Sequence, residues 1–224
     1  MADDRETGRI NDILFFYNTL MMPENMKIEN QGRTINFNEK QITLLDRFVL
    51  DFIRVLEPQT PYVIVSGYVA ILFGRSRGTE DVDILVPRLE KATFVALHAA
   101  LLREGYEFLN AEDTDGLYEM LTGKMGIRVA KTGQFIPNIE LKFFKDEVDR
   151  SVFQNRVDVV LPDTHVYISP IEIQSAYKIW LGSPKDIEDA IFLFEIFRQN
   201  LDQELLKEQM KALKVSGDEY GIIL

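Results

Sequence analysis

Two aspartates separated by one residue, Asp81 and Asp83, have the types and spacing best suited to chemistry in this sequence. They flank Val82 in a segment, residues 81–86, whose apolar alternation predicts a strand. Because side chains alternate between the two faces of a strand, both carboxylates should lie on one face, about 6–7 Å apart. That spacing suits two divalent cations about 4 Å apart, which stabilise the attacking and leaving oxygens of a phosphoryl displacement.

A small polar pair, Ser66-Gly67, lies between an apolar run at residues 62–65 and an expected helix at residues 68–73. The start of a helix presents free N–H groups and so binds phosphate, Gly67 would let the ligand approach the backbone, and Ser66 adds a hydroxyl. The structural alternative is that Ser66 caps the helix and Gly67 relieves the turn. Taken alone, the pair favours that alternative.

The composition of the chain limits the kinds of catalytic site, metal site and partner that it can have. The chain of 224 residues has no cysteine and only two histidines, which excludes disulfides, thiolate nucleophiles and multi-histidine zinc sites. Any catalysis must therefore use carboxylates, hydroxyls, lysines and arginines, and a metal that assists it would be a hard one held by oxygen. The net charge of -11 disfavours extended nucleic acid as a partner, whereas a small nucleotide is compatible because a metal screens its phosphates.

The ends and apolar runs of the sequence favour a cytoplasmic protein without membrane contact. The first six residues are acidic and lack the basic-then-apolar order of a signal peptide. The longest apolar run, residues 94–102, is too short to span a bilayer and contains His98.

The elements that must position these residues predict an α+β fold in three parts. We expect a helical N-terminal extension at residues 1–58, a strand-rich core at 59–169 and a helical C-terminal region at 170–224. The expected strands cover residues 62–65, 81–86, 117–122, 127–131, 139–144, 156–161 and 166–169. The expected helices cover residues 10–22, 38–56, 68–73, 89–104, 171–181, 184–197 and 201–215, with a small hairpin at 26–37.

The order of motifs from Ser66 to Asp83 resembles the signature of the polymerase-beta superfamily of nucleotidyltransferases. That signature is a Gly-Gly or Gly-Ser pair, an alanine, a glycine, an arginine, a threonine and then Asp-x-Asp. It is matched by Ser66-Gly67-Tyr68-Val69-Ala70, Gly74-Arg75-Ser76-Arg77-Gly78-Thr79 and Asp81-Val82-Asp83. One departure is Ser66, which stands where the first glycine is usual. The resemblance spans roughly residues 62–190 and is strong only in 66–86.

The resemblance implies a fold with a small mixed sheet and helices packed on it. It also implies two Mg²⁺ ions, a nucleoside triphosphate (NTP) such as ATP as substrate, and a third carboxylate on a later strand. Glu140 is the favoured candidate, with Asp158 as the competitor. Asp81, Asp83 and Glu140 would then hold the metal, and Glu140 would accept the proton of the attacking hydroxyl.

The same resemblance assigns nucleotide contacts to five residues, namely Ser66, Gly67, Arg77, Thr79 and Lys142. Arg77 and Lys142 would neutralise charge on the triphosphate. The alternative for Arg77 is a surface ion pair with Glu80 or Asp113.

The C-terminal segment is similar to the helical part of nucleotidyltransferases related to abortive-infection toxins, through Lys178, Lys185, Asp186 and Asp189. This implies that Lys178 contacts phosphate and that Asp186 helps to activate the acceptor hydroxyl. A structural alternative fits equally well, because Ser183-Pro184-Lys185-Asp186 also has the pattern of a helix start, with Ser183 as the cap.

The acceptor could be a small molecule, a protein or the end of a transfer RNA, and a toxin held by an antitoxin-like partner is one version. A catalytically silent nucleotide-binding or interaction module of the same fold is the alternative. We interpret His98 and Trp180 as packing residues, and the second Asp-x-Asp, Asp113 and Asp115, as a solvated turn.

Overall fold

The computed structural model describes residues 22–111 and 113–222. Its centre is a nine-stranded mixed sheet in the order β1-β2-β8-β9-β3-β4-β7-β6-β5. The strands are β1 (Lys27–Glu29), β2 (Thr34–Asn36), β3 (Val63–Val65), β4 (Asp81–Val86), β5 (Tyr106–Phe108), β6 (Ile127–Lys131), β7 (Asn138–Phe143), β8 (Val157–Val160) and β9 (His165–Ile168).

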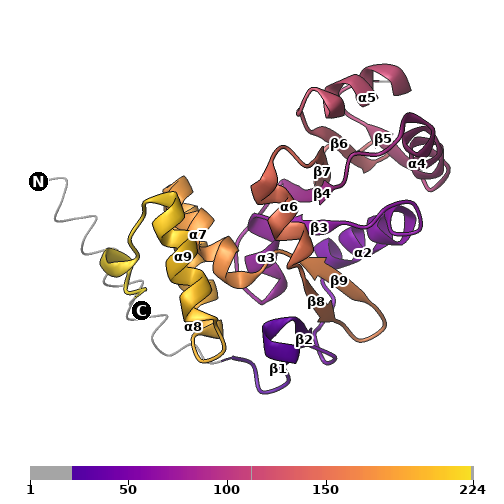
Figure 1. Cartoon of the computed structure of the whole chain (residues 1–224). Coiled ribbons are helices and arrows are strands. Elements are labelled where there is room, and N and C mark those ends of the chain that lie inside the picture. Colours follow the sequence, from indigo (N-terminus) through magenta and orange to yellow (C-terminus); the bar gives the residue numbers. More distant parts are fainter. Residues whose placement is uncertain (1–21, 112, 223–224) are drawn as a thin grey trace, which may run out of the picture.

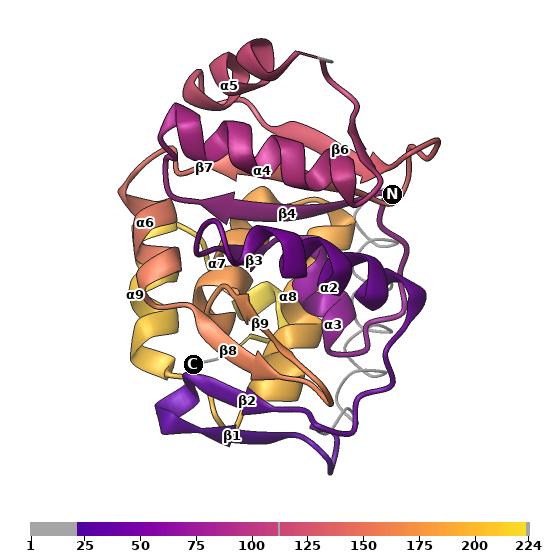
Figure 2. The same ribbon diagram turned by 90° about the vertical axis from the view of Figure 1, so that its right-hand side faces the viewer.

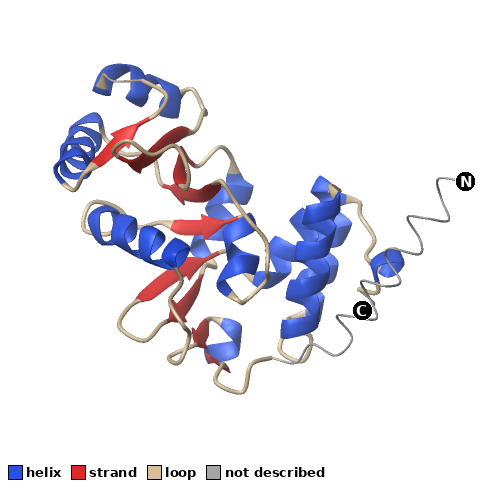
Figure 3. Ribbon diagram, turned by 180° about the vertical axis from the view of Figure 1, so that it is seen from behind, coloured by secondary structure: helices blue, strands red, loops and turns tan. Residues whose placement is uncertain are grey.

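Helices lie on both sides of the sheet. Figure 1 shows α7, α8 and α9 on one side and α2 and α4 on the other, and Figure 3 shows the same layers from behind. The α-helices are α2 (Leu44–Leu56), α3 (Gly67–Leu72), α4 (Lys91–Arg103), α5 (Thr114–Thr122), α6 (Glu147–Gln154), α7 (Ile171–Leu181), α8 (Pro184–Phe197) and α9 (Gln203–Leu213). The described residues also form two 3-10 helices, η1 (Asn30–Gly32) and η2 (Asp218–Tyr220).

The sheet is larger than the small sheet that the sequence predicts. The expected hairpin at residues 26–37 forms as β1 and β2, and β2 pairs in parallel with β8, which extends one edge (Figure 2). At the other edge β5 pairs with β6. The sequence does not predict β5, because three residues are too few to show a period.

The strand predicted at residues 117–122 is wrong, because this segment belongs to α5. Leu117 and Leu121, four residues apart, are both buried, as a helix requires. Asp113 accepts a hydrogen bond from the backbone N–H of Gly116 at 2.6 Å and so caps the helix. The second Asp-x-Asp is therefore a helix start rather than a solvated turn.

Two N-terminal predictions have different outcomes. The helix predicted at residues 10–22 falls almost wholly outside the described residues. The helix predicted at 38–56 forms only as α2, where the side chain of Thr43 bonds the backbone of Asp46 and that of Asp46 bonds the backbone of Thr43. The three-part division of the chain stays a prediction.

No helix in the two described stretches has the length and apolar run that a membrane crossing needs.

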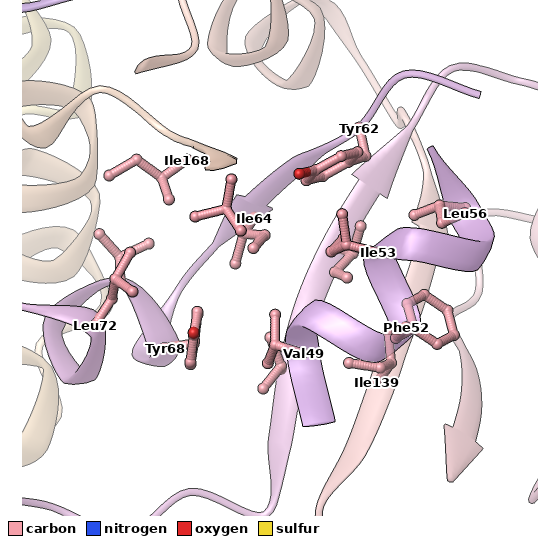
Figure 4. Packing of buried hydrophobic residues seen from close by; sticks show 14 of the residues in the cluster. Val49, Phe52, Ile53, Leu56, Tyr62, Ile64, Tyr68, Leu72, Ile139 and Ile168 are labelled. Carbon is pink, nitrogen blue, oxygen red and sulfur yellow. The ribbon is translucent and has the colours of Figure 1, made fainter. Parts of the chain in front are cut away.

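The core side of the sheet fixes the strands that carry the aspartates. Val82 and Ile84 of β4 are fully buried, as is Ile139 of the neighbouring strand β7. Figure 4 shows Val49 and Phe52 of α2 packed beside Ile139. Because alternate residues point to opposite faces, this packing directs the intervening polar side chains of β4 and β7 away from α2.

Candidate functional site

Three adjacent strands bring the predicted carboxylates and the Ser66-Gly67 turn together. Strands β4 and β7 run parallel, and their register places Asp83 opposite Glu140. On the other side of β4, Val65 of β3 is opposite Asp83, so the turn that begins at Ser66 follows directly beside this aspartate. Asp81, Asp83 and Glu140 are all half-buried on the face away from α2.

Lys142 lies between two of these carboxylates. Its Nζ is 2.7 Å from Oδ1 of Asp83 and 2.9 Å from Oε2 of Glu140. Burial alone would lower the pKa of the Lys142 ammonium, but Asp83 and Glu140 outweigh burial and raise this pKa above its ordinary value. The ammonium therefore stays charged and offsets the negative charge of the cluster.

Glu140 also depends on a glycine that the sequence analysis did not identify. A Cβ atom at Gly126 would lie 2.6 Å from Oε1 of Glu140. The carboxylate therefore occupies space that any other residue at position 126 would take, and nothing in the sequence connects these two positions.

The carboxylates of Asp81, Asp83 and Glu140 are of the chemical type that binds magnesium, since carboxylate oxygens are the hard ligands that this ion prefers. Within residues 22–111 and 113–222, however, no three Asp, Glu or His side chains converge on one point where they could hold a metal ion. Lys142 takes the place between Asp83 and Glu140. Asp158, the competing third carboxylate, lies on β8, which β9 and β3 separate from β4, and bonds Nδ1 of His165 at 2.9 Å.

The turn at Ser66 is held by a buried glutamine. Ser66 has φ 66° and ψ −139°, a region that glycine adopts far more readily, and its side chain makes no capping bond to α3. Oε1 of Gln174 accepts from the Ser66 N–H at 3.2 Å, and its Nε2 donates to the Ser66 carbonyl at 2.8 Å. The capping alternative for Ser66 is therefore wrong. No pattern in the sequence predicts that Gln174 contacts this turn.

Arg77 lies directly over Gly67. A Cβ atom at Gly67 would be 1.8 Å from Nη2 of Arg77, so only glycine leaves room for this guanidinium. Its Nε is 3.3 Å from Oδ1 of Asp189, and its side chain is 15% exposed. The predicted alternative partners, Glu80 and Asp113, are wrong.

Asp189 is the centre of a buried ion network. Its Oδ1 accepts from Nη1 of Arg75 at 2.9 Å, and its Oδ2 accepts from Nζ of Lys178 at 2.8 Å. Lys178 also donates to Oδ1 of Asp186 at 2.6 Å, and Arg75 reaches Oε2 of Glu188 at 2.5 Å. We call Arg75, Arg77, Lys178, Asp186, Glu188 and Asp189 the buried network. It connects the loop between α3 and β4 to α7 and α8.

Two predicted catalytic residues belong to this network. The side chain of Lys178 is 2% exposed and that of Asp186 is 10% exposed. Ser183 accepts from the backbone N–H of Asp186 and caps α8, as the structural alternative predicts. Burial by itself raises the pKa of Asp186, but bonds from Lys178 and Ser183 outweigh it and leave this pKa below its ordinary value. Their catalytic roles stay predictions.

Thr79 and Trp180 are two further residues that the sequence analysis singled out. Thr79 donates to the backbone carbonyl of Asp81 at 2.8 Å and so helps to set the start of β4. Trp180 is 51% exposed and stacks on Tyr177, so its assignment as a packing residue is wrong. Burial raises the pKa of Tyr177, and the charge of Asp149 adds to this rise.

Comparison with known proteins gives little more. No family model matches the chain, and no curated protein matches it. Among solved structures, the chain is similar to an antigenic nucleotidyltransferase-like protein from Paracoccidioides brasiliensis. The identity is 18%, the TM-score is 0.47, and the match covers 79% of this chain and 89% of that one.

Proposed function

We propose that this protein is a metal-dependent nucleotidyltransferase that transfers a nucleoside monophosphate from an NTP to an acceptor hydroxyl. The observation that carries the proposal is the register of three adjacent strands. It places Asp83 of β4 opposite Glu140 of β7 and beside the end of β3, where the Ser66-Gly67 turn begins. The backbone that we propose to bind phosphate and the carboxylates that we propose to bind metal therefore lie close together.

In the proposed reaction, the acceptor oxygen forms a bond to the α-phosphorus. The bond from this phosphorus to the oxygen that bridges to the β-phosphorus breaks, and pyrophosphate leaves. Glu140 accepts the proton of the acceptor hydroxyl. Magnesium, when bound by Asp81, Asp83 and Glu140, would neutralise charge on the attacking and leaving oxygens.

The side chains around the turn have separate roles in binding. Gly67 is buried beneath Arg77, so phosphate oxygens would meet its backbone N–H together with the Arg77 guanidinium, and the Ser66 hydroxyl would donate to them. Arg77, fixed over Gly67 by Asp189, supplies positive charge beside the same phosphates. Thr79 acts indirectly through the carbonyl of Asp81. Lys178 and Asp186, which are buried, would act by supporting Arg77 rather than by touching substrate.

The acceptor in this proposal is a hydroxyl of a small molecule, a protein or the end of a transfer RNA. A toxin controlled by an antitoxin-like partner is one form of the same activity. A second candidate is a catalytically silent nucleotide-binding module. The pairing of Lys142 with Asp83 and Glu140 favours it, because a lysine already neutralises these carboxylates without metal.

The test is calorimetric titration of each of the common NTPs, with and without Mg²⁺, into the native chain and the D81N/D83N variant. The matched control is D113N/D115N, which alters the other Asp-x-Asp of the chain at the start of α5. We expect Mg²⁺-dependent binding that D81N/D83N abolishes and the control retains. Binding that is independent of Mg²⁺ and of both aspartates would favour the silent module, and no binding of any NTP would overturn both candidates.

A further inference from the structure

The ammonium of Lys142 occupies the space that a cation shared by Asp83 and Glu140 would need. It lies within 2.9 Å of an oxygen of each carboxylate. Within the described residues, Lys142 makes no further hydrogen bond or ion pair. Its side chain is 20% exposed, so it keeps some contact with solvent.

We propose that Lys142 is the internal counterion of this site, which a divalent cation must displace before Asp83 and Glu140 can share it. This inference rests on the proposed function, since it takes those two carboxylates as metal ligands. Lys142 bonds one oxygen of Asp83 and one of Glu140, and so holds these two carboxylates around its own charge.

The chemistry of lysine suits this role. An ammonium on a flexible four-carbon stem is a compact point charge that can leave its partners by rotation of the stem. Lys142 is the next residue on the same face of β7 after Glu140, and Phe143 ends the strand. Rotation of the stem therefore requires no change in strand pairing. Release moves the positive charge outward, where the phosphates of a bound triphosphate would meet it.

The counterion role predicts that removal of Lys142 strengthens metal binding, whereas a lysine that only contacted phosphate would leave metal binding nearly unchanged. Removal of a unit charge in direct contact with two ligands should lower the dissociation constant for a divalent cation by about tenfold or more. A similar charge a few residues away should change it by less than about twofold, because solvent screens it.

The experiment measures free Mn²⁺ by electron paramagnetic resonance during titration of the full chain without nucleotide. K142M is compared with the native chain and with K145M, which removes a lysine three residues away that makes no ion pair with Asp83 or Glu140. K142R retains the charge and should bind Mn²⁺ like the native chain. If K142M has a lower unfolding temperature than the native chain, K142Q replaces it as the variant without the charge.

We expect K142M or K142Q to bind Mn²⁺ about tenfold more tightly, with K145M and K142R close to the native value. Equal or weaker binding by the neutral variants would overturn the inference, as would equal tightening by K142R. The inference and the proposed function can fail separately. If neutral variants do not bind Mn²⁺ more tightly but Mg²⁺-dependent NTP binding still needs Asp81 and Asp83, only the inference fails. If they do bind Mn²⁺ more tightly but no NTP binds, only the transferase proposal fails.

Discussion

Two ion clusters lie beside the segment from Ser66 to Val86, and they differ mainly in burial. The Asp83–Lys142–Glu140 cluster has side chains that are 17–22% exposed. In the buried network, the side chains of Asp189, Lys178 and Arg75 are 0–6% exposed. Both clusters join carboxylates to a lysine, and the buried network adds Arg75 and Arg77.

The difference in burial gives the two clusters different consequences. Charges without access to water depend wholly on one another, so breaking one contact leaves an uncompensated charge inside the protein. Charges at the mouth of a site can exchange one partner for another, because water supports the intermediate states. The buried network therefore holds Arg77 in place, while the half-buried Asp83–Lys142–Glu140 cluster can exchange one partner for another.

The largest expected effect comes from Asp189→Ala, which removes the shared acceptor of Arg75, Arg77 and Lys178. We expect the free energy of unfolding to fall by about 3–5 kcal/mol, because three cations would then lack their central partner. Urea denaturation measures it. Asp83→Ala is the matched control and should cost less than about 1 kcal/mol. Equal costs for the two variants would remove the distinction between the clusters.

The next effect comes from Gly67→Ala, because the added methyl group would meet Nη2 of Arg77. We expect a loss of about 1–3 kcal/mol in the free energy of unfolding as the guanidinium is displaced. NTP affinity should fall as well, since Arg77 would leave the turn. Gly78→Ala is the control, because a Cβ there meets no atom within 4 Å. If Gly67→Ala binds NTP as tightly as the native chain, Arg77 does not take part in nucleotide binding.

The loss of folding stability at low pH should depend on the buried network. Because the pKa of Asp186 is lower in the folded chain, its contribution is complete above the pKa of the unfolded chain, about 4. The contribution is lost as pH falls through the still lower folded pKa. We expect Lys178→Met to reduce this loss of stability below about pH 4, measured by thermal unfolding across pH. If the loss of stability at low pH is the same in Lys178→Met and the native chain, Lys178 does not hold Asp186 ionised.

The smallest expected effect distinguishes the two candidate third carboxylates. Asp158→Asn removes a partner of His165 far from β4 and should leave Mg²⁺-dependent NTP binding within about twofold of the native value. Glu140→Gln should weaken it by about tenfold. Calorimetry on both variants makes the comparison, and a larger loss in Asp158→Asn would contradict the assignment of Glu140.

Much of the fold around the site can be predicted from local signals. The bounds of β4, α7 and α8 agree with the sequence prediction, because β4 alternates clearly and Pro170, Gly182 and Pro184 mark where the helices begin and end. The face shared by Asp81 and Asp83 follows from strand period alone. In α5, by contrast, the dense apolar residues Leu117, Tyr118, Met120 and Leu121 resemble a strand as much as a helix.

The contacts that hold the site together are different, because they join distant parts of the chain. Arg75 and Asp189 are 114 positions apart, and Gln174 bonds Ser66 across 108 positions. Periodicity cannot report such pairs. The surface pair of Tyr177 and Trp180 was missed for a related reason, since an aromatic residue in an apolar helix usually packs inward.

The most direct test of the account is diffraction at the manganese absorption edge from crystals of the full chain grown with Mn²⁺ and a non-hydrolysable NTP analogue. The account predicts an anomalous peak beside Asp81 and Asp83, the triphosphate against Ser66 and Gly67, and Lys142 withdrawn from Asp83 and Glu140. Manganese or nucleotide bound only elsewhere on the molecule, with Lys142 still between the two carboxylates, would contradict it.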